Sequence, residues 1–233
     1  MLMFGFFDPT MVLLIPALLF AFWAQWKVQH TYQKFSRVPA ANGRSGREMA
    51  LAIMARNGVT DVAVEEVGGL LSDHYDPRVR KVRLSSRNYR DHSIASIAVA
   101  THEVGHVLQH AQGYAGLQFR TALAPVASIG SMAAFPLFMI GLFFHIPGVS
   151  LVLMDLGILF FSGAVLFHLV TLPVEFDASR RALVQLTGSG SIAPSEVAGA
   201  KKVLDAAALT YVAAAAMAAL QLVRLVMLRN SRD

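Results

Sequence analysis

Four long apolar runs constrain the fold of this chain more than any other feature. The hydrocarbon core of a bilayer is about 30 Å thick, so a helix needs about 20 mostly apolar residues to cross it. Four segments meet this requirement, namely Phe6–Trp26, Ala122–Phe144, Val149–Val170 and Ala206–Leu228. Only 15% of the 233 residues are charged, whereas soluble domains carry about 25%. We therefore expect an integral membrane protein with about four transmembrane helices.

The first apolar run is expected to stay in place as a transmembrane helix. It contains Asp8 but no basic residue before Lys27, whereas a cleavable signal peptide begins with a basic region. Trp23 and Trp26 come just before Lys27, a pattern typical of an anchor at the membrane interface.

The distribution of lysine and arginine predicts the orientation of the chain. Thirteen of the 20 basic residues lie between the first and second apolar runs, four lie between the third and fourth, and none precedes the end of the first. By the positive-inside rule both of these segments are cytoplasmic and the N-terminus is outside. Arg224, Arg229 and Arg232 do not fit this pattern, so the rule leaves the side of the C-terminus open.

The long segment between the first two runs has the pattern of a small α+β unit. A capping-box pattern begins a short helix over Ser45–Arg56. Two stretches with strand character follow, Val62–Val67 and Lys81–Ser85. The second alternates polar and apolar residues, so we expect a half-exposed strand at the edge of the sheet. A further helix, capped by Asp91 or Ser93, comes next.

The sequence thus predicts a mainly α-helical membrane protein with a small α+β unit. The expected regions are a first transmembrane helix (1–27), a cytoplasmic α+β unit (28–120), a transmembrane hairpin (121–171), a helical segment (172–205) and a C-terminal transmembrane helix (206–233).

His102, Glu103 and His106 form the motif H-E-x-x-H in the last helix of the α+β unit. Residues four apart lie on one helix face, offset by about 40°, so the two imidazoles can bind one ion. Glu103 is rotated by about 100° from His102 and can instead reach a water on that ion. Zinc polarises this water, and the carboxylate accepts its proton during attack on a peptide carbonyl.

The same motif also occurs by chance in helices that bind no metal. Here the small and apolar run Ile94–Ala100 precedes it, so much of the helix surface is expected to be buried. Histidine and glutamate without partners would be costly in such a place. The chain has no cysteine, which restricts the ligands to His, Asp and Glu. We therefore expect a zinc site, one ion per chain.

A catalytic zinc takes three protein ligands, so a third must come from elsewhere. Glu175 is the best candidate, because it lies at the expected cytoplasmic end of the third apolar run. Asp177 competes with it, but two residues further on it faces another side of the helix. His110 lies one turn beyond His106 and is expected at the rim or behind the ligands.

Several stretches together resemble a known family, the neutral zinc metallopeptidases of bacterial membranes (YugP-like). The stretches are Asp73–Arg78, Val82–Ser85, His102–His106 and Val174–Ala182. The resemblance covers nearly the whole chain. It implies a gluzincin-type membrane peptidase in which His102, His106 and Glu175 match the zinc ligands and Glu103 the catalytic acid/base, on a zincin-like α+β unit. It also implies a bacterial cytoplasmic membrane.

More distantly, the chain is similar to the heat-shock membrane proteases and the CAAX prenyl endopeptidases. Those have an aspartate four residues after the glutamate ligand, where this chain has Ser179. A carboxylate behind the ligands is therefore in doubt, and Arg180 or Arg181 is a candidate to orient Glu175 or hold the substrate.

His74 and Tyr75 are further candidates, in a turn-like cluster before the second strand. Either could donate a hydrogen bond to the oxyanion of the transition state. The alternative is a turn that Asp73 and Asp76 hold for structural reasons only.

The sequence therefore predicts a zinc endopeptidase that acts on unfolded or membrane-associated polypeptides near the bilayer surface, with Lys81–Ser85 pairing with the substrate. Two alternatives remain: a zinc amidohydrolase acting on a lipid-linked substrate, and a non-catalytic scaffold or adaptor that keeps the zinc site. Each of these three functions is compatible with association of the chain with a second copy of itself or with another membrane protein. A nucleic-acid partner is not expected, because no basic patch with stacking aromatics stands out.

Overall fold

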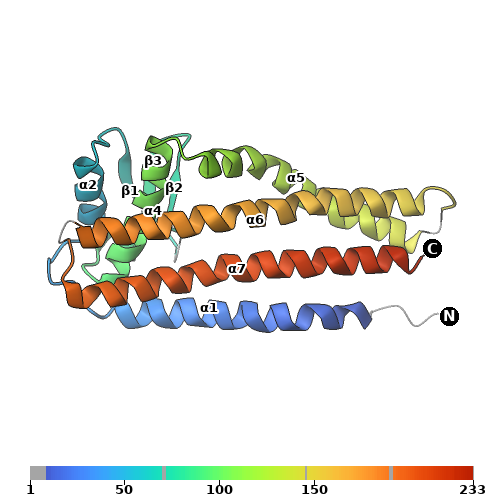
Figure 1. Ribbon diagram of the computed structural model, residues 1–233, viewed down its shortest axis with the longest axis horizontal. Helices are drawn as coiled ribbons and strands as arrows, with labels where there is room; N and C mark the ends of the chain where they lie inside the picture. Colours follow the sequence, from blue (N-terminus) through green and yellow to red (C-terminus); the bar gives the residue numbers. More distant parts are fainter. Residues whose placement is uncertain (1–8, 70–71, 145, 189–190, 233) are drawn as a thin grey trace. The chain divides into compact units, whose positions relative to one another are not determined.

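The computed structural model describes residues 9–69, 72–144, 146–188 and 191–232 (Figure 1). The start of the first predicted span, residues 6–8, lies outside this part. The chain forms two compact units, which we describe separately. The helical unit comprises Met1–Ala24, Phe119–Leu172 and Tyr211–Asp233, and the mixed unit comprises Gln25–Gln118 and Pro173–Thr210.

In the part of the chain that the structure describes, four helical segments are long and apolar enough to cross a membrane. The first is a 3₁₀ turn, Pro9–Leu14, followed by α1, Ile15–Phe35. The others are α5 (Ala115–Phe143), α6 (Ser150–Gly188) and α7 (Pro194–Asn230). The fold class is confirmed as a mainly α-helical membrane protein. Helices α6 and α7 run on without interruption beyond their apolar runs.

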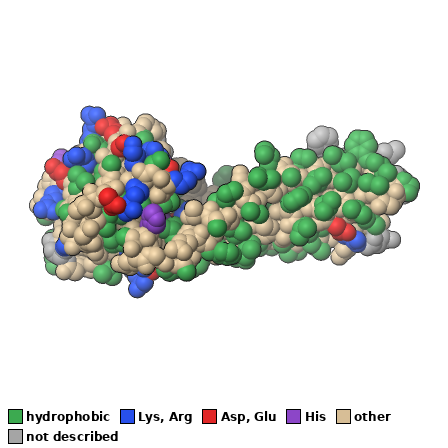
Figure 2. Space-filling view, turned by 90° about the horizontal axis from the view of Figure 1, so that it is seen from above, with side chains coloured by type: hydrophobic (Ala, Val, Ile, Leu, Met, Phe, Trp, Pro, Cys, Tyr) green, Lys and Arg blue, Asp and Glu red, His purple; other side chains and the backbone are tan. Residues whose placement is uncertain are grey.

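The surface of the helical unit is apolar, as contact with lipid requires. Figure 2 shows hydrophobic side chains over this unit, while charged side chains gather over the mixed unit. Small residues let α5 and α6 approach closely. A Cβ atom at Gly157 would lie 2.8 Å from the carbonyl oxygen of Ala134, and one at Gly130 would lie 2.9 Å from that of Phe160. Such contacts between small residues are typical of helix packing in membranes.

Helix α2, Gly46–Arg56, belongs to the mixed unit, and the predicted capping box is present. The Ser45 side chain accepts a hydrogen bond from the Glu48 backbone, and the Glu48 carboxylate accepts one from the Ser45 backbone. These contacts satisfy two N–H groups that a helix end leaves open.

A three-stranded sheet follows α2. Its strands are β1 (Ala63–Val67), β2 (His74–Asp76) and β3 (Lys81–Ser85), in the order β1-β3-β2. Strand β3 pairs in parallel with β1 and antiparallel with β2. The segment Asp73–Pro77, which the sequence predicts as a turn, thus contains strand β2.

The prediction that Lys81–Ser85 is an edge strand is wrong, because β3 lies in the centre of the sheet. Its alternating residues report on the two faces of the sheet. Val82 and Leu84 are fully buried on one face, while Lys81 and Arg83 on the other pair with Glu65 of β1. Polar and apolar residues alternate along a strand when the two faces of the sheet differ in polarity. This pattern does not indicate whether the strand lies at the edge or in the centre of the sheet.

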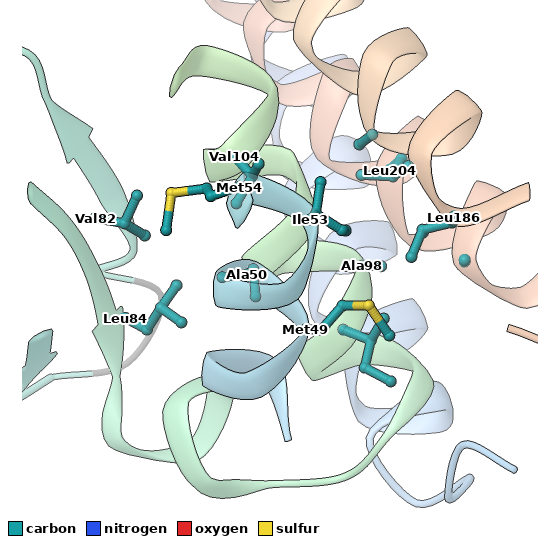
Figure 3. Packing of buried hydrophobic residues seen from close by; sticks show 14 of the residues in the cluster. Met49, Ala50, Ile53, Met54, Val82, Leu84, Ala98, Val104, Leu186 and Leu204 are labelled. Atoms are coloured by element: carbon teal, nitrogen blue, oxygen red, sulfur yellow. The ribbon is translucent and has the colours of Figure 1, made fainter. Parts of the chain in front are cut away.

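Helices α3 (Ser86–Arg90) and α4 (Ile94–Ala111) complete the mixed unit, and Ser93 caps α4 as predicted. The core lies between α2, α4 and the sheet (Figure 3). Its members include Met49, Ile53, Val82, Leu84 and Val104, together with Leu186 of α6 and Leu204 of α7. These contacts fix α4 and the outer part of α6 within one packed body.

Candidate metal centre

Helix α4 presents His102 and His106 on one face, as their spacing predicts. The two ring centroids are 4.9 Å apart and the ring planes are nearly perpendicular, at 85°. His106 and Glu103 are each only 7% exposed. Since isolated polar side chains are costly in such surroundings, these groups need polar partners.

Glu175 of α6 is a partner that both imidazoles share. Its Oε2 atom lies 3.2 Å from Nε2 of His102 and 3.5 Å from Nε2 of His106. The carboxylate is 2% exposed. The donor atoms of the three residues all lie within 4.8 Å of one another.

This donor set fits a zinc ion. Two imidazole nitrogens and one carboxylate oxygen are the ligands of many catalytic zinc sites, which keep a fourth position open. With bonds of about 2.0–2.2 Å in a tetrahedron, neighbouring donor atoms are about 3.3–3.6 Å apart. The two distances to Glu175 are close to this range.

Gly105 allows α4 and α6 to come close enough for this arrangement. A Cβ atom at this position would overlap the carbonyl oxygen of Ala178 and lie 3.1 Å from its Cα atom. Ala178 is itself fully buried and follows Glu175 by less than one helical turn. The glycine of the motif therefore brings the backbones of the two helices into contact beside the three donor groups.

Gln109 contacts His106 at Nδ1, the ring nitrogen that does not face Glu175. The sequence analysis did not predict this residue. Its Oε1 atom lies 2.9 Å from Nδ1 of His106. Its Nε2 atom donates to the carbonyl oxygen of Val174 at 2.8 Å and to Asp177 at 3.0 Å. Both of these partners can only accept, so the amide NH₂ must face them and Oε1 must face the imidazole. His106 therefore carries its proton on Nδ1, and Nε2 keeps its lone pair for a metal.

Asp177 accepts a hydrogen bond from Gln109 and forms ion pairs with two arginines. Arg180 and Arg181 both form ion pairs with its carboxylate. Arg181 also hydrogen bonds to Gln112 and lies over the ring of Tyr114, 5.6 Å from its centroid. Within the described residues, the ion pairs of both arginines are thus with Asp177 rather than with Glu175.

Ser179 of α6 lies next to His102, on the side of the ring that carries Nδ1. Its Oγ atom is 3.1 Å from Nδ1 of His102. A hydroxyl can donate or accept, so this contact orients the ring without deciding which nitrogen carries the proton. The group beside Nδ1 of His102 is thus a neutral hydroxyl and not a carboxylate.

Glu103 is next to the three donor groups but is not one of them. Burial raises its pKa to about 7, and the nearby carboxylates of Glu175 and Asp73 add to this, while His102 opposes it. The backbone N–H of Tyr75 lies near the Glu103 carboxylate and also lowers its pKa. Strand β2 thus runs beside the glutamate.

Tyr75 and His110 form a pair of their own. The Tyr75 hydroxyl lies 2.7 Å from Nδ1 of His110, and burial raises the tyrosine pKa, so the hydroxyl keeps its proton at neutral pH. His74 is on the other face of β2, since neighbouring side chains in a strand alternate. It is exposed, bonds to the Ser72 carbonyl and faces Arg83.

Comparison with known proteins agrees with this geometry. Residues 10–230 match the family model described as "Putative neutral zinc metallopeptidase". The chain is 49% identical over 222 residues to the "Putative membrane protease YugP" of Bacillus subtilis (strain 168), an alignment that covers 95% of this chain and 97% of that protein. No solved structure matches the chain. The chain therefore belongs to the neutral zinc metallopeptidase family of membrane proteases.

Proposed function

We propose that this protein is a zinc-dependent endopeptidase of the gluzincin type. The observation that carries the proposal is the convergence of His102 and His106 of α4 with Glu175 of α6, beside the buried Glu103. In this proposal His102, His106 and Glu175 hold one zinc ion, and Glu103 is the acid/base. The ion, when bound, would supply a Lewis acid that polarises a water and the carbonyl of the scissile peptide bond.

Glu103 is suited to move a proton in both directions. A pKa of about 7 lies near the pH at which the enzyme would work, where an acid/base group is most effective. Its carboxylate accepts the proton of the attacking water and then delivers it to the leaving amine. The N–H of Tyr75 lies near this carboxylate and favours its charged form.

We propose that the substrate is an unfolded or membrane-associated polypeptide that lies along β2. An extended chain can add to the open edge of a sheet by backbone hydrogen bonds. The open edge next to Glu103 belongs to β2, since β3 has a strand on each side. This replaces Lys81–Ser85 as the strand that meets the substrate.

The proposed location is a bacterial cytoplasmic membrane, with the site on the cytoplasmic side. Thirteen basic residues between the first and second apolar runs support this orientation. The division into a first transmembrane helix, an α+β unit, a hairpin, a helical segment and a last transmembrane helix is part of the same proposal.

The test compares the wild type with Glu103→Gln, both purified in detergent, for bound zinc and for cleavage of casein. The substitution keeps the shape of the side chain and leaves the ligands in place. We expect about one zinc per chain in both proteins, with cleavage in the wild type alone. Chelation should stop this cleavage, and added zinc should restore it.

Other results of this experiment would favour the alternatives. Zinc in both proteins with no cleavage of casein by either would point to a scaffold, or to an amide substrate such as a lipid-linked one. Equal cleavage by Glu103→Gln would contradict the role of Glu103.

A further inference from the structure

A basic groove lies between α1 and α7 within the mixed unit, away from the residues of the metal centre. Its volume is about 400 Å³. The side chains that matter for its chemistry are Lys27, His30 and Lys34 of α1 and Lys202, Asp205 and Leu209 of α7.

The charges of the basic groove favour an anion. Three ammonium groups, from Lys27, Lys34 and Lys202, line it together with the carboxylate of Asp205. Asp205 also pairs with Lys201 at 2.6 Å, so its charge is shared with a lysine that is not part of the lining. Cations reach the groove from both helices, which suits a ligand with several anionic or acceptor oxygens.

The position of the basic groove along α1 corresponds to the headgroup layer. The apolar stretch from residue 9 to Trp26, a 3₁₀-helix followed by the start of α1, is about 30 Å long, close to the thickness of the hydrocarbon core. Trp23 and Trp26 are exposed at its end, as interfacial aromatics are. The groove begins with the next residue, Lys27, and reaches Lys34 about 10 Å further along.

The two helices also place apolar and charged groups at opposite ends of the basic groove. Helix α7 runs antiparallel to this part of α1 (Figure 1), and a Cβ atom at Gly199 would lie 2.8 Å from the ring of Phe35. Leu209 is therefore near Lys27 at the membrane end, and Lys202 is near Lys34 at the outer end. A lipid has the same order, with its glycerol next to the apolar core and its phosphate further out.

We propose that the basic groove binds the phosphate-bearing headgroup of an acidic glycerophospholipid. The ammonium groups contact the headgroup oxygens, and Leu209 contacts the glycerol and the first acyl carbons. The site is independent of the proposed peptidase activity. A free phosphate offers the same oxygens without the acyl chains, so a test must separate the two sources.

Tryptophan fluorescence can report on the basic groove directly. The chain has two tryptophans, and the ring of Trp26 stacks on His30 of the groove, with centroids 5.1 Å apart. In the full-length chain with Trp23→Phe, Trp26 is the single reporter. The protein is reconstituted in phosphatidylcholine vesicles that contain a minor share of brominated phosphatidylglycerol or, in parallel, of brominated phosphatidylcholine.

We expect the brominated acidic lipid to quench Trp26 more strongly than the brominated neutral lipid. Each ammonium group near an acidic headgroup corresponds to an enrichment of about five-fold. Lys34→Gln with Lys202→Gln should remove most of this preference. The control, Arg44→Gln with Arg78→Gln, changes the net charge equally at exposed positions outside the groove and should keep it.

Three results would overturn the proposal. The first is equal quenching by the two lipids. The second is equal loss of the preference in both double variants, which would show attraction by net charge alone. The third is loss of the preference on adding inorganic phosphate at constant ionic strength, which would assign the site to a soluble anion.

Discussion

The two histidines of the metal centre lie on one face of α4, but the side chains behind them differ. Behind His106, the amide of Gln109 is fully buried and is held by two acceptors. Behind His102 there is one hydroxyl, that of Ser179. The amide cannot rotate without losing its hydrogen bonds, whereas a hydroxyl rotates freely. His106 is therefore the more strongly preorganised ligand, and removing the support of each histidine should have unequal effects.

Gly105→Ala should have the largest effect, because it acts on both histidines together. The added methyl group overlaps the Ala178 carbonyl and moves α6, with Glu175, away from α4. Overpacking of this kind typically costs about 1–3 kcal/mol of stability. We expect a larger loss of zinc affinity than for the Gln109 and Ser179 variants below, as measured by competition with a chromogenic chelator.

The matched control for Gly105→Ala is Gly163→Ala in α6, where a Cβ atom would meet nothing within 4 Å. This variant should bind zinc as the wild type does. Wild-type affinity in Gly105→Ala would mean that the close contact between α4 and α6 is not required.

Gln109→Leu should come next, and it should affect His106 alone. The leucine has a similar volume but offers no acceptor to Nδ1 of His106. Loss of such a support typically lowers metal affinity by about 10–100-fold. Imidazole ¹⁵N spectra of the zinc-free protein provide a second readout. We expect the Nδ1–H tautomer of His106 in the wild type and a mixture of tautomers in the variant, and an unchanged spectrum would refute the role of Gln109.

Ser179→Ala should have the smallest effect, because the hydroxyl does not fix the tautomer of His102. We expect a loss of less than about 10-fold in zinc affinity. Ser179→Asp places a carboxylate beside His102 and should increase the affinity, since a carboxylate makes the imidazole a better ligand. If Ser179→Ala were as damaging as Gln109→Leu, the contrast between the two histidines would not exist.

The features that follow from local patterns could be predicted from the sequence. Ser45 and Ser93 cap their helices as expected, because capping depends on residues within one turn. The apolar runs gave the fold class for a similar reason, since length and hydropathy are properties of a single segment. The common face of His102 and His106 follows from the period of the helix.

The features that depend on contacts between distant segments could not be predicted in full. Sequence reasoning narrowed the third ligand to Glu175 or Asp177, and the structure places Glu175 beside both histidines. Gln109 was missed, because a neutral amide belongs to no metal motif. Its position three residues after His106, on the same side of the helix, was the one available signal. The prediction that Lys81–Ser85 is an edge strand was wrong for the same reason, since the tertiary fold decides which strands pair.

The most direct test of the account is the zinc content of three purified proteins at saturating zinc: the wild type, Glu175→Ala and Asp177→Ala. The account predicts about one zinc per chain in the wild type and in Asp177→Ala, where the three donor groups remain. It predicts loss of the bound zinc in Glu175→Ala, because two imidazoles alone hold the ion weakly. Full zinc content in Glu175→Ala, or a loss confined to Asp177→Ala, would contradict the assignment of Glu175 as the third ligand.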